Sequence, residues 1–217
     1  MVTAGPDIHD LASRGELVAY FGYGSLVNLA THRTGIVQAV PARLSGWRRC
    51  WRARPDMPGF PAALLTIREE HGVFCEGLLV FDHAENLAAV DEREARYRRV
   101  PVPPDRLEAG IRMPDGCPVY VYQAETDIPP HPEPPMILQS YLDAVLQGFL
   151  HVHGEAGVRR FVEETEGFET QIHADRLEPS YPRAVTLADR ERELFDMLLA
   201  ARLSRLAGTV DFAIAAG

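Results

Sequence analysis

One glutamate lies at a position where a side chain could do acid/base chemistry. The segment from Glu85 to about Tyr97 has helical periodicity. Steps of about 100° per residue place Glu94 within roughly 20° of Leu87 and between Leu87 and Val90, in the middle of the apolar stripe. A carboxylate that faces the core must be paired, hydrogen-bonded or protonated. In a desolvated pocket its pKa would rise toward neutrality, which suits a general acid/base at pH 7.

Two interpretations of this glutamate stay open from the residues alone. Glu94 is either an acid/base in a pocket, or it pairs with a buried arginine and is purely structural. Its neighbours Glu92 and Arg93 fall well away from the apolar stripe, so we expect both to point outward.

A second candidate is the stretch from Tyr20 to Leu26, where an apolar strand runs into a turn with two glycines and a serine. Glycine tolerates positive φ and has no side chain, so another group can approach the main chain at Gly22 and Gly24. The amides of such a turn can form an anion site for a carboxylate or phosphate. The alternative is a tight strand–helix turn with aromatic packing.

Other chemistries have weaker support in the sequence. Gly22-x-Gly24 is followed by no Gly-Lys-Ser/Thr and lacks the third glycine of a dinucleotide motif. His151-x-His153 would point its two rings apart on a helix, which does not favour a metal site. Three widely spaced cysteines predict neither a zinc site nor a disulfide framework. We therefore expect no cofactor and no metal.

The elements that must position these residues are short strands followed by helices. Leu17 to Phe21 is the first expected strand, and the single early helix argues for an antiparallel or mixed barrel-like sheet rather than a βαβ repeat. The further expected strands are 36–44, 46–53, 62–67, 73–81 (after a turn near 70–72) and 119–124.

A proline-rich connector at 127–135 separates two regions. Residues 1–126 are predicted to form the barrel-like domain, and 136–217 a helical C-terminal extension packed on it. Helices are expected over 136–150, 154–165 and 190–206, where apolar residues recur at helical spacing. Tyr181 and Arg183 in this extension either close a pocket or anchor a loop.

Composition excludes several function classes. The hydrophobic fraction of 46% and charged fraction of 24% are those of a soluble globular protein. The net charge of −9 argues against nucleic acid or an anionic membrane as a partner, and the basic cluster Arg48/Arg49/Arg52/Arg54 is expected to be solvated or ion-paired. No apolar run is long enough to span a membrane and no secretory signal is recognisable, so we expect a cytoplasmic protein.

Three segments together resemble the γ-glutamylcyclotransferase superfamily, which includes ChaC-like and AIG2-like proteins. They are Phe21-Gly-Tyr-Gly-Ser-Leu26, Glu76-Gly-Leu-Leu79 and Val90-Asp-Glu-Arg-Glu-Ala-Arg-Tyr97. Their order and spacing carry the resemblance, which covers roughly residues 17–125. It implies an α+β fold, a mixed β-barrel flanked by helices, for the first domain.

The resemblance also implies roles for individual residues. Glu94 would be the catalytic acid/base, and the loop of Tyr23, Gly24, Ser25 and Leu26 would offer amides to the glutamyl end of the substrate. Tyr97 matches the family's tyrosine three residues after the glutamate. Tyr122 matches the tyrosine on the late strand, although Tyr120 could be the equivalent.

The implied reaction cyclises a γ-glutamyl group to 5-oxoproline and releases an amine or amino acid, so the expected partner is a small γ-glutamyl substrate. Ala95 stands where many members have glycine, which bears on pocket shape and substrate. Two rival functions remain open. One is a non-catalytic module that binds a γ-glutamyl or related small acid; the other is an amide hydrolase that uses the same carboxylate with water.

Overall fold

The computed structural model describes residues 7–54, 62–124 and 134–215, which form two compact units. The first comprises Met1–Arg48 with Thr66–Asp127, and the second Arg49–Leu65 with Ile128–Gly217. Two long strands, β2 (Gln38–Arg54) and β3 (Ala62–His83), contribute residues to both. The second unit therefore contains part of the strand region as well as the helical segment. The predicted connector at 127–135 lies outside the described residues except for its last two prolines.

The first unit is built on a mixed sheet with β1 (Leu17–Gly22) near its centre. The other strands are β4 (Tyr97–Pro101), β5 (Leu107–Ala109) and β6 (Val119–Ala124), in the order β4-β6-β1-β3-β2-β5. β1 pairs antiparallel with β3 (Leu17 opposite His83) and parallel with β6 (Ala19 opposite Val119). Every residue of β1 is buried, as expected for an unbroken apolar run between two neighbours.

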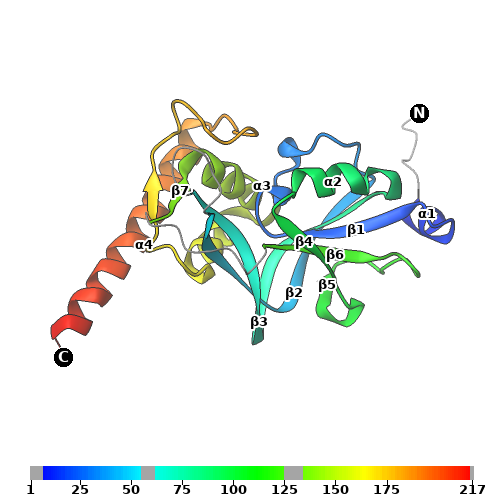
Figure 1. Ribbon diagram of the computed structural model, residues 1–217, viewed down its shortest axis with the longest axis horizontal. Helices are drawn as coiled ribbons and strands as arrows, with labels where there is room; N and C mark the ends of the chain where they lie inside the picture. Colours follow the sequence, from blue (N-terminus) through cyan, green and yellow to red (C-terminus); the bar gives the residue numbers. More distant parts are fainter. Residues whose placement is uncertain (1–6, 55–61, 125–133, 216–217) are drawn as a thin grey trace. The chain divides into compact units, whose positions relative to one another are not determined.

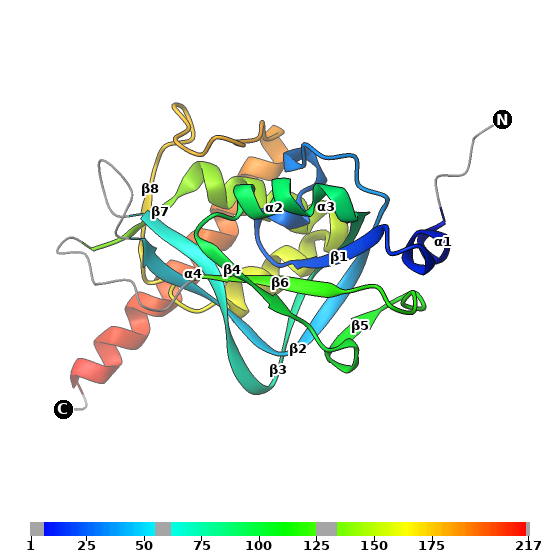
Figure 2. The same cartoon turned by 45° about the vertical axis from the view of Figure 1, so that its right-hand side comes forward.

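Two short helices accompany this sheet, α1 (Ile8–Ser13) and α2 (Leu87–Arg93). Figures 1 and 2 show α2 lying along strands β1 and β6. Side-chain bonds hold it there, because Asp91 accepts from Tyr122 on β6 and from Arg99 on β4. The helix ends earlier than the sequence pattern predicts: Glu94 is its cap, with φ −100° and ψ 32°, and Tyr97 already pairs with Ala124.

The long strands join segments that we predicted as separate strands. β2 runs through both 36–44 and 46–53, and β3 runs through the turn expected near 70–72. Gly46 and Gly72 lie within them at φ 80° and 81°, values that side-chain-bearing residues rarely adopt. Gly72, in the expected turn, therefore lets β3 continue through an irregular point, and Gly46 does the same for β2.

The second unit is organised around two helices, α3 (Gln139–Glu164) and α4 (Asp189–Ala215), which contact each other. α3 contains a break at Gly154 (φ 66°), so the two helices predicted over 136–150 and 154–165 are present as halves of one kinked helix. Residues Met136–Leu138 instead form the short strand β7. It pairs in parallel with β8 (Gln171–His173) and with Ala62 at the start of β3.

Arg49 is enclosed within the second unit rather than solvated. It is 3% exposed, its guanidinium lies 4.9 Å from the ring centroid of Phe149 and 4.7 Å from that of Phe161, and Nε donates to Thr165 Oγ1 at 3.3 Å. The rings and the hydroxyl replace part of the hydration that the cation loses. Arg48, the preceding residue, donates instead to Glu70 at 2.7 Å.

A buried carboxylate caps the start of α3. Asp175 accepts from the Ser140 amide at 2.8 Å, the Ser140 hydroxyl at 2.6 Å and the Ser180 amide at 3.0 Å. The Tyr181 amide donates to Ser140 Oγ at 3.3 Å, and the Tyr181 ring meets Tyr141 edge-on at 5.0 Å. Tyr181 therefore anchors its loop, which was one of its two predicted roles.

The fold class agrees with the prediction: it is an α+β arrangement with a mixed sheet and a helical C-terminal segment. The sheet is open, because its strand order runs from β4 to β5 without the two pairing. None of the helices in the described ranges is both long enough and apolar enough to cross a membrane.

Candidate functional site

Two glycines let the turn after β1 pack closely. A Cβ on Gly22 would lie 2.8 Å from Leu26 Cβ, and a Cβ on Gly77 of β3 would lie 2.1 Å from the Gly22 carbonyl oxygen. Neither distance is possible for a real side chain, so both positions need glycine. Gly24 has φ −128°, so the turn is not left-handed. Close approach, rather than positive φ, explains the glycine at position 22.

The chain then forms two 3₁₀ turns, Ser25–Val27 and Leu29–Thr31. The first bond inside the turn runs from the Val27 amide to the Gly24 carbonyl at 2.9 Å. The amides of Ser25 and Leu26 precede it and have no acceptor within the turn, as at the start of any helix. They are the groups that a carboxylate or an oxyanion could use.

Glu94 caps α2 and is only partly accessible. Its amide donates to Val90 O at 3.0 Å, and its side chain is 14% exposed. A carboxylate oxygen lies 3.1 Å from Arg93 Nε. Of the two interpretations left open by the sequence, the arginine partner is therefore present. An ion pair at this position is compatible with either a structural or a chemical role.

Arg93 is the residue that sequence reasoning missed, since it does not point outward. Its side chain is 9% exposed, and besides Glu94 it bonds to both 3₁₀ turns. Nη1 donates to Thr31 O at 3.0 Å, and Nη2 donates to Thr31 Oγ1 at 2.9 Å and to Ser25 Oγ at 3.2 Å. Arg93 thus connects the candidate carboxylate directly to the candidate binding turn. Helical spacing gave no signal for Arg93, because its partners belong to the two 3₁₀ turns, which lie far away in the sequence.

Tyr122 and Tyr23 link the turn to β6 and α2 by hydrogen bonds. The Tyr122 hydroxyl donates to Asp91 Oδ1 at 2.6 Å, and the Tyr23 hydroxyl donates to Tyr122 O at 2.6 Å. Burial, and secondarily the hydrogen bond and charge of Asp91, raises the pKa of Tyr122 far above its ordinary value; the charge of Glu94 acts in the same direction. Tyr122 is thus a neutral donor, close enough to Glu94 to sense its charge.

Tyr20 contacts the turn through His32, which bonds to Leu26. Its hydroxyl donates to Asp82 Oδ2 at 3.2 Å and lies 3.5 Å from His32 Nδ1. His32 Nε2 lies 2.9 Å from the Leu26 carbonyl oxygen, which can only accept, so Nε2 carries the proton. Burial and then Asp82 raise the pKa of Tyr20 well above its usual range, with a further contribution from Glu94.

The predicted site residues lie in the turn, adjoin it, or begin β4. Tyr23, Gly24, Ser25 and Leu26 form the turn, and Tyr122 and Glu94 adjoin it through the bonds and charges described above. Tyr97 begins β4, and its amide donates to Glu94 O at 2.8 Å. Tyr120 lies under Arg99, 4.7 Å from ring centroid to guanidinium, so Tyr122 is the tyrosine that reaches α2.

The described part of the chain contains no cluster of three or more His, Cys, Asp or Glu side chains that could hold a metal ion.

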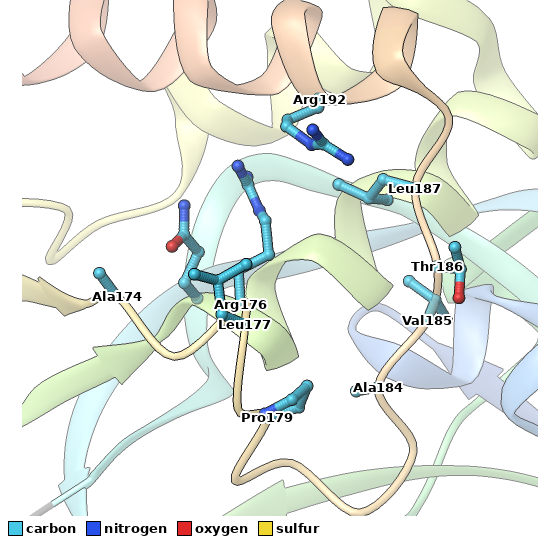
Figure 3. A pocket seen from close by; sticks show the side chains of 10 residues that line it. Ala174, Arg176, Leu177, Pro179, Ala184, Val185, Thr186, Leu187 and Arg192 are labelled. Atoms are coloured by element: carbon cyan, nitrogen blue, oxygen red, sulfur yellow. The ribbon is translucent and has the colours of Figure 1, made fainter.

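A pocket of about 640 Å³ lies within the second unit, away from these residues in the sequence. Arg176 extends from its lining toward α4, where Arg192 lies (Figure 3). The Arg176 guanidinium is held by Asp143 at 2.7 Å and Asp196 at 2.9 Å, so its charge is already matched. The pocket contains none of the predicted site residues.

Neither a protein-family model nor a curated protein matches this sequence. Solved structures do. The chain is similar to a γ-glutamyl cyclotransferase (14% identity, 84% of this chain and 99% of the other, TM-score 0.48). It is also similar to an uncharacterized human protein (16% identity, 83% of this chain and 99% of the other, TM-score 0.47). A third similar structure is a glutathione-specific γ-glutamyl cyclotransferase from yeast (12% identity, 88% of this chain and 96% of the other, TM-score 0.43).

Two of these three proteins are γ-glutamyl cyclotransferases. This is the superfamily that the motifs resemble. These similarities decide nothing about the chemistry of this chain, so the functional argument rests on the side chains of the site.

Proposed function

We propose that this protein is a γ-glutamylcyclotransferase-like enzyme, which converts a γ-glutamyl group into 5-oxoproline and releases an amine or amino acid. One observation carries the proposal: a single guanidinium, that of Arg93, bonds both the carboxylate of Glu94 and the hydroxyl of Ser25 in the glycine-rich turn. An acid and an anion-binding turn are the two components that this reaction requires.

The chemistry is an intramolecular acyl transfer. The α-ammonium of the substrate must first lose a proton, and Glu94 is the proposed acceptor. The free amine then attacks the γ-carbonyl carbon, and Glu94 returns the first proton to the leaving nitrogen. Glu94 next takes the second proton of the attacking nitrogen, which becomes the N–H of the ring, while the bond from the carbonyl carbon to the leaving nitrogen breaks. That second proton passes to the released amine or to water, and Ser25 is not a nucleophile in this scheme.

Positioning would supply much of the rate. Well-oriented intramolecular reactions reach effective molarities on the order of 10⁵–10⁸ M. The Ser25 and Leu26 amides, which precede the first bond of their turn, are proposed to hold the developing oxyanion or a substrate carboxylate. One such donor is typically worth about 10²–10³ in rate. Tyr122, neutral and hydrogen-bonded to Asp91, would line the site.

The Arg93–Glu94 ion pair also favours a second candidate, a non-catalytic module that binds a γ-glutamyl or related small acid. An acid held by a guanidinium at 3.1 Å could serve only to fix the turn. Incubation with glutathione, γ-glutamyl amino acids and γ-glutamylamines, followed by mass spectrometry, separates the possibilities. The enzyme yields 5-oxoproline, an amide hydrolase yields free glutamate, and a binding module yields neither.

A further inference from the structure

Asp82 is a buried carboxylate that takes no part in the proposed reaction. It is the last residue but one of β3 and is fully enclosed. Oδ1 accepts from the His83 amide at 2.8 Å and from Asn86 Nδ2 at 2.7 Å. Oδ2 accepts from the Tyr20 hydroxyl at 3.2 Å and from Thr34 Oγ1 at 3.0 Å. In the part of the chain that the structure describes, no cation forms an ion pair with Asp82, so its buried charge depends on these hydrogen bonds.

Asn86 precedes α2, yet its side chain does not cap the helix. Asparagine is favoured at this position because its oxygen can accept from the first amides of a helix. Here the Asn86 side chain makes no capping bond, and its nitrogen donates to Asp82 instead. The N-terminal end of α2 is therefore attached to the end of β3.

The same carboxylate also holds the loop that continues from the glycine-rich turn. Thr34, which follows the second 3₁₀ turn, donates to Asp82 directly. Tyr20 donates to Asp82 and stacks on His32, with the two ring planes 11° apart. His32 in turn bonds to the Leu26 carbonyl oxygen. Asp82 is thus linked both to the turn and to the start of α2.

Both ends of α2 are consequently tied to one loop. At its C-terminal end, Arg93 bonds to both 3₁₀ turns. At its N-terminal end, Asn86 is linked to Thr34 through the carboxylate of Asp82. A helix of seven residues is too short to be stable alone, so its order and position depend on such attachments. With two attachments, the helix cannot pivot about one end and carry Glu94 away from the turn.

We propose that Asp82 positions α2, and with it Glu94, against the turn whose amides would hold the substrate. Asp82 does so through its hydrogen bonds and touches neither the substrate nor the reacting atoms, so it is a positioning residue. The inference rests on the proposed cyclisation and adds to it a residue that no motif indicates.

Asn86→Ala removes the N-terminal attachment and no capping bond. We expect kcat for 5-oxoproline release to fall at least about tenfold, because small displacements of a reacting group are costly in rate. KM should stay within about twofold, because Thr34 and Tyr20 still hold the loop through Asp82. Glu85→Ala, at the exposed neighbour, is the matched control and should keep the wild-type kcat. A wild-type kcat in folded Asn86→Ala would overturn the inference.

Two substitutions of Asp82 separate its bonds from its charge. Asp82→Asn keeps an oxygen for Asn86, and its new amide can donate to the hydroxyls of Tyr20 and Thr34, which accept as well as donate. Asp82→Ala removes every bond. We expect kcat within about threefold of wild type in Asp82→Asn and a loss of at least about tenfold in Asp82→Ala. Equal losses in two folded variants would contradict positioning by hydrogen bonds. If Asp82→Ala does not fold, Asn86→Ala and Glu85→Ala decide.

A readout without turnover keeps the two proposals separate. The Glu94 amide lies at the opposite end of α2 from Asn86, and its NMR resonance should shift in Asn86→Ala but not in Glu85→Ala. An unmoved Glu94 resonance in Asn86→Ala would overturn the positioning role. A shifted resonance in a protein that releases no 5-oxoproline from any γ-glutamyl compound would remove the cyclisation and keep the attachment. Turnover that is unchanged in Asn86→Ala would do the reverse.

Discussion

Arg93 Nε lies 3.1 Å from a carboxylate oxygen of Glu94, and the two side chains are 9% and 14% exposed. Adjacent residues at the end of a helix rarely face each other, because successive side chains point in different directions. Here the helix ends at Arg93, and the non-helical cap at Glu94 turns the carboxylate back toward the guanidinium. The pair thereby joins the end of α2 to the turn after β1.

Substitution of Gly77 should disturb the turn from the neighbouring strand. In Gly77→Ala the new Cβ would lie 2.1 Å from the Gly22 carbonyl oxygen and 2.7 Å from Phe21 Cζ, so β1 must shift. We expect a loss of about 1–3 kcal/mol in the free energy of unfolding, as for other overpacked sites. Gly110→Ala is the control, since nothing lies within 4 Å of its Cβ position. Denaturant unfolding measures both; equal stability of the two variants would contradict the close approach.

The hydrogen bond between Tyr122 and Asp91 should contribute to stability. Tyr122→Phe removes a 2.6 Å bond from a buried hydroxyl, and Asp91 retains Arg99 at 2.7 Å. We expect a loss of about 1 kcal/mol in unfolding free energy. Tyr120→Phe on the same strand keeps the ring beneath Arg99 and should change stability by less than about 0.5 kcal/mol. A larger effect at Tyr120 than at Tyr122 would be inconsistent with this assignment.

Tyr20 and Tyr122 should resist ionisation. Burial and neighbouring carboxylates raise the pKa of Tyr20 and Tyr122 above the ordinary value of 10.0. Because the folded state holds these protons more tightly, the stability they contribute is complete below pH about 10 and declines as the pH rises further. Spectrophotometric titration of the folded protein should therefore show at least two tyrosines that remain protonated above pH about 10, and Tyr20→Phe or Tyr122→Phe should remove one of them. Ionisation of every tyrosine near pH 10, without unfolding, would contradict this expectation.

Asp175 should confer acid-sensitive stability on the second unit. Burial alone would raise its pKa, but the hydrogen bonds from Ser140 and Ser180 outweigh burial and lower it below 3.8. A lowered pKa gives stability that is complete above the unfolded value and disappears as the pH falls through the folded one. Asp175→Asn should cost about 1–3 kcal/mol at pH 7.

The difference between wild type and Asp175→Asn should begin to narrow below pH about 3.8, where the unfolded carboxylate takes up its proton, and should close only at the lower pH at which the folded carboxylate is protonated. Unfolding free energies at neutral and acid pH measure this change. Asp115→Asn, at a side chain 95% exposed, should show little difference at either pH. A gap that stays constant with pH would show that the Asp175 carboxylate charge is not what stabilises the loop.

Much of the fold could be predicted because local patterns and tertiary packing agree. The run from Leu17 to Gly22 is apolar without alternation, and it forms a central strand buried throughout. β6 spans Val119–Ala124, as its β-branched and aromatic residues predict. Gly72 was misleading, because glycine marks an irregular point in a strand as readily as its end.

The candidate site was predicted in part, and the missing part has a physical cause. Helical spacing drew attention to Glu94 and glycine content to the turn at Tyr23 to Leu26, although α2 ends at Arg93 and Glu94 is its non-helical cap. Arg93 was missed because its partners lie in the two 3₁₀ turns, which no pattern around residue 93 indicates. His32 was missed because its contact with Leu26 O depends on the second 3₁₀ turn, which no pattern indicates.

The rate of 5-oxoproline release by Glu94→Gln tests the central claim most directly. The amide keeps the size of the side chain but cannot accept the proton. Glu92→Gln, at the exposed position two residues earlier, is the matched control. We predict that Glu94→Gln folds and loses at least about 10² in kcat, the usual contribution of a general base, while Glu92→Gln retains wild-type turnover. A folded Glu94→Gln protein that releases 5-oxoproline at the wild-type rate would contradict the account.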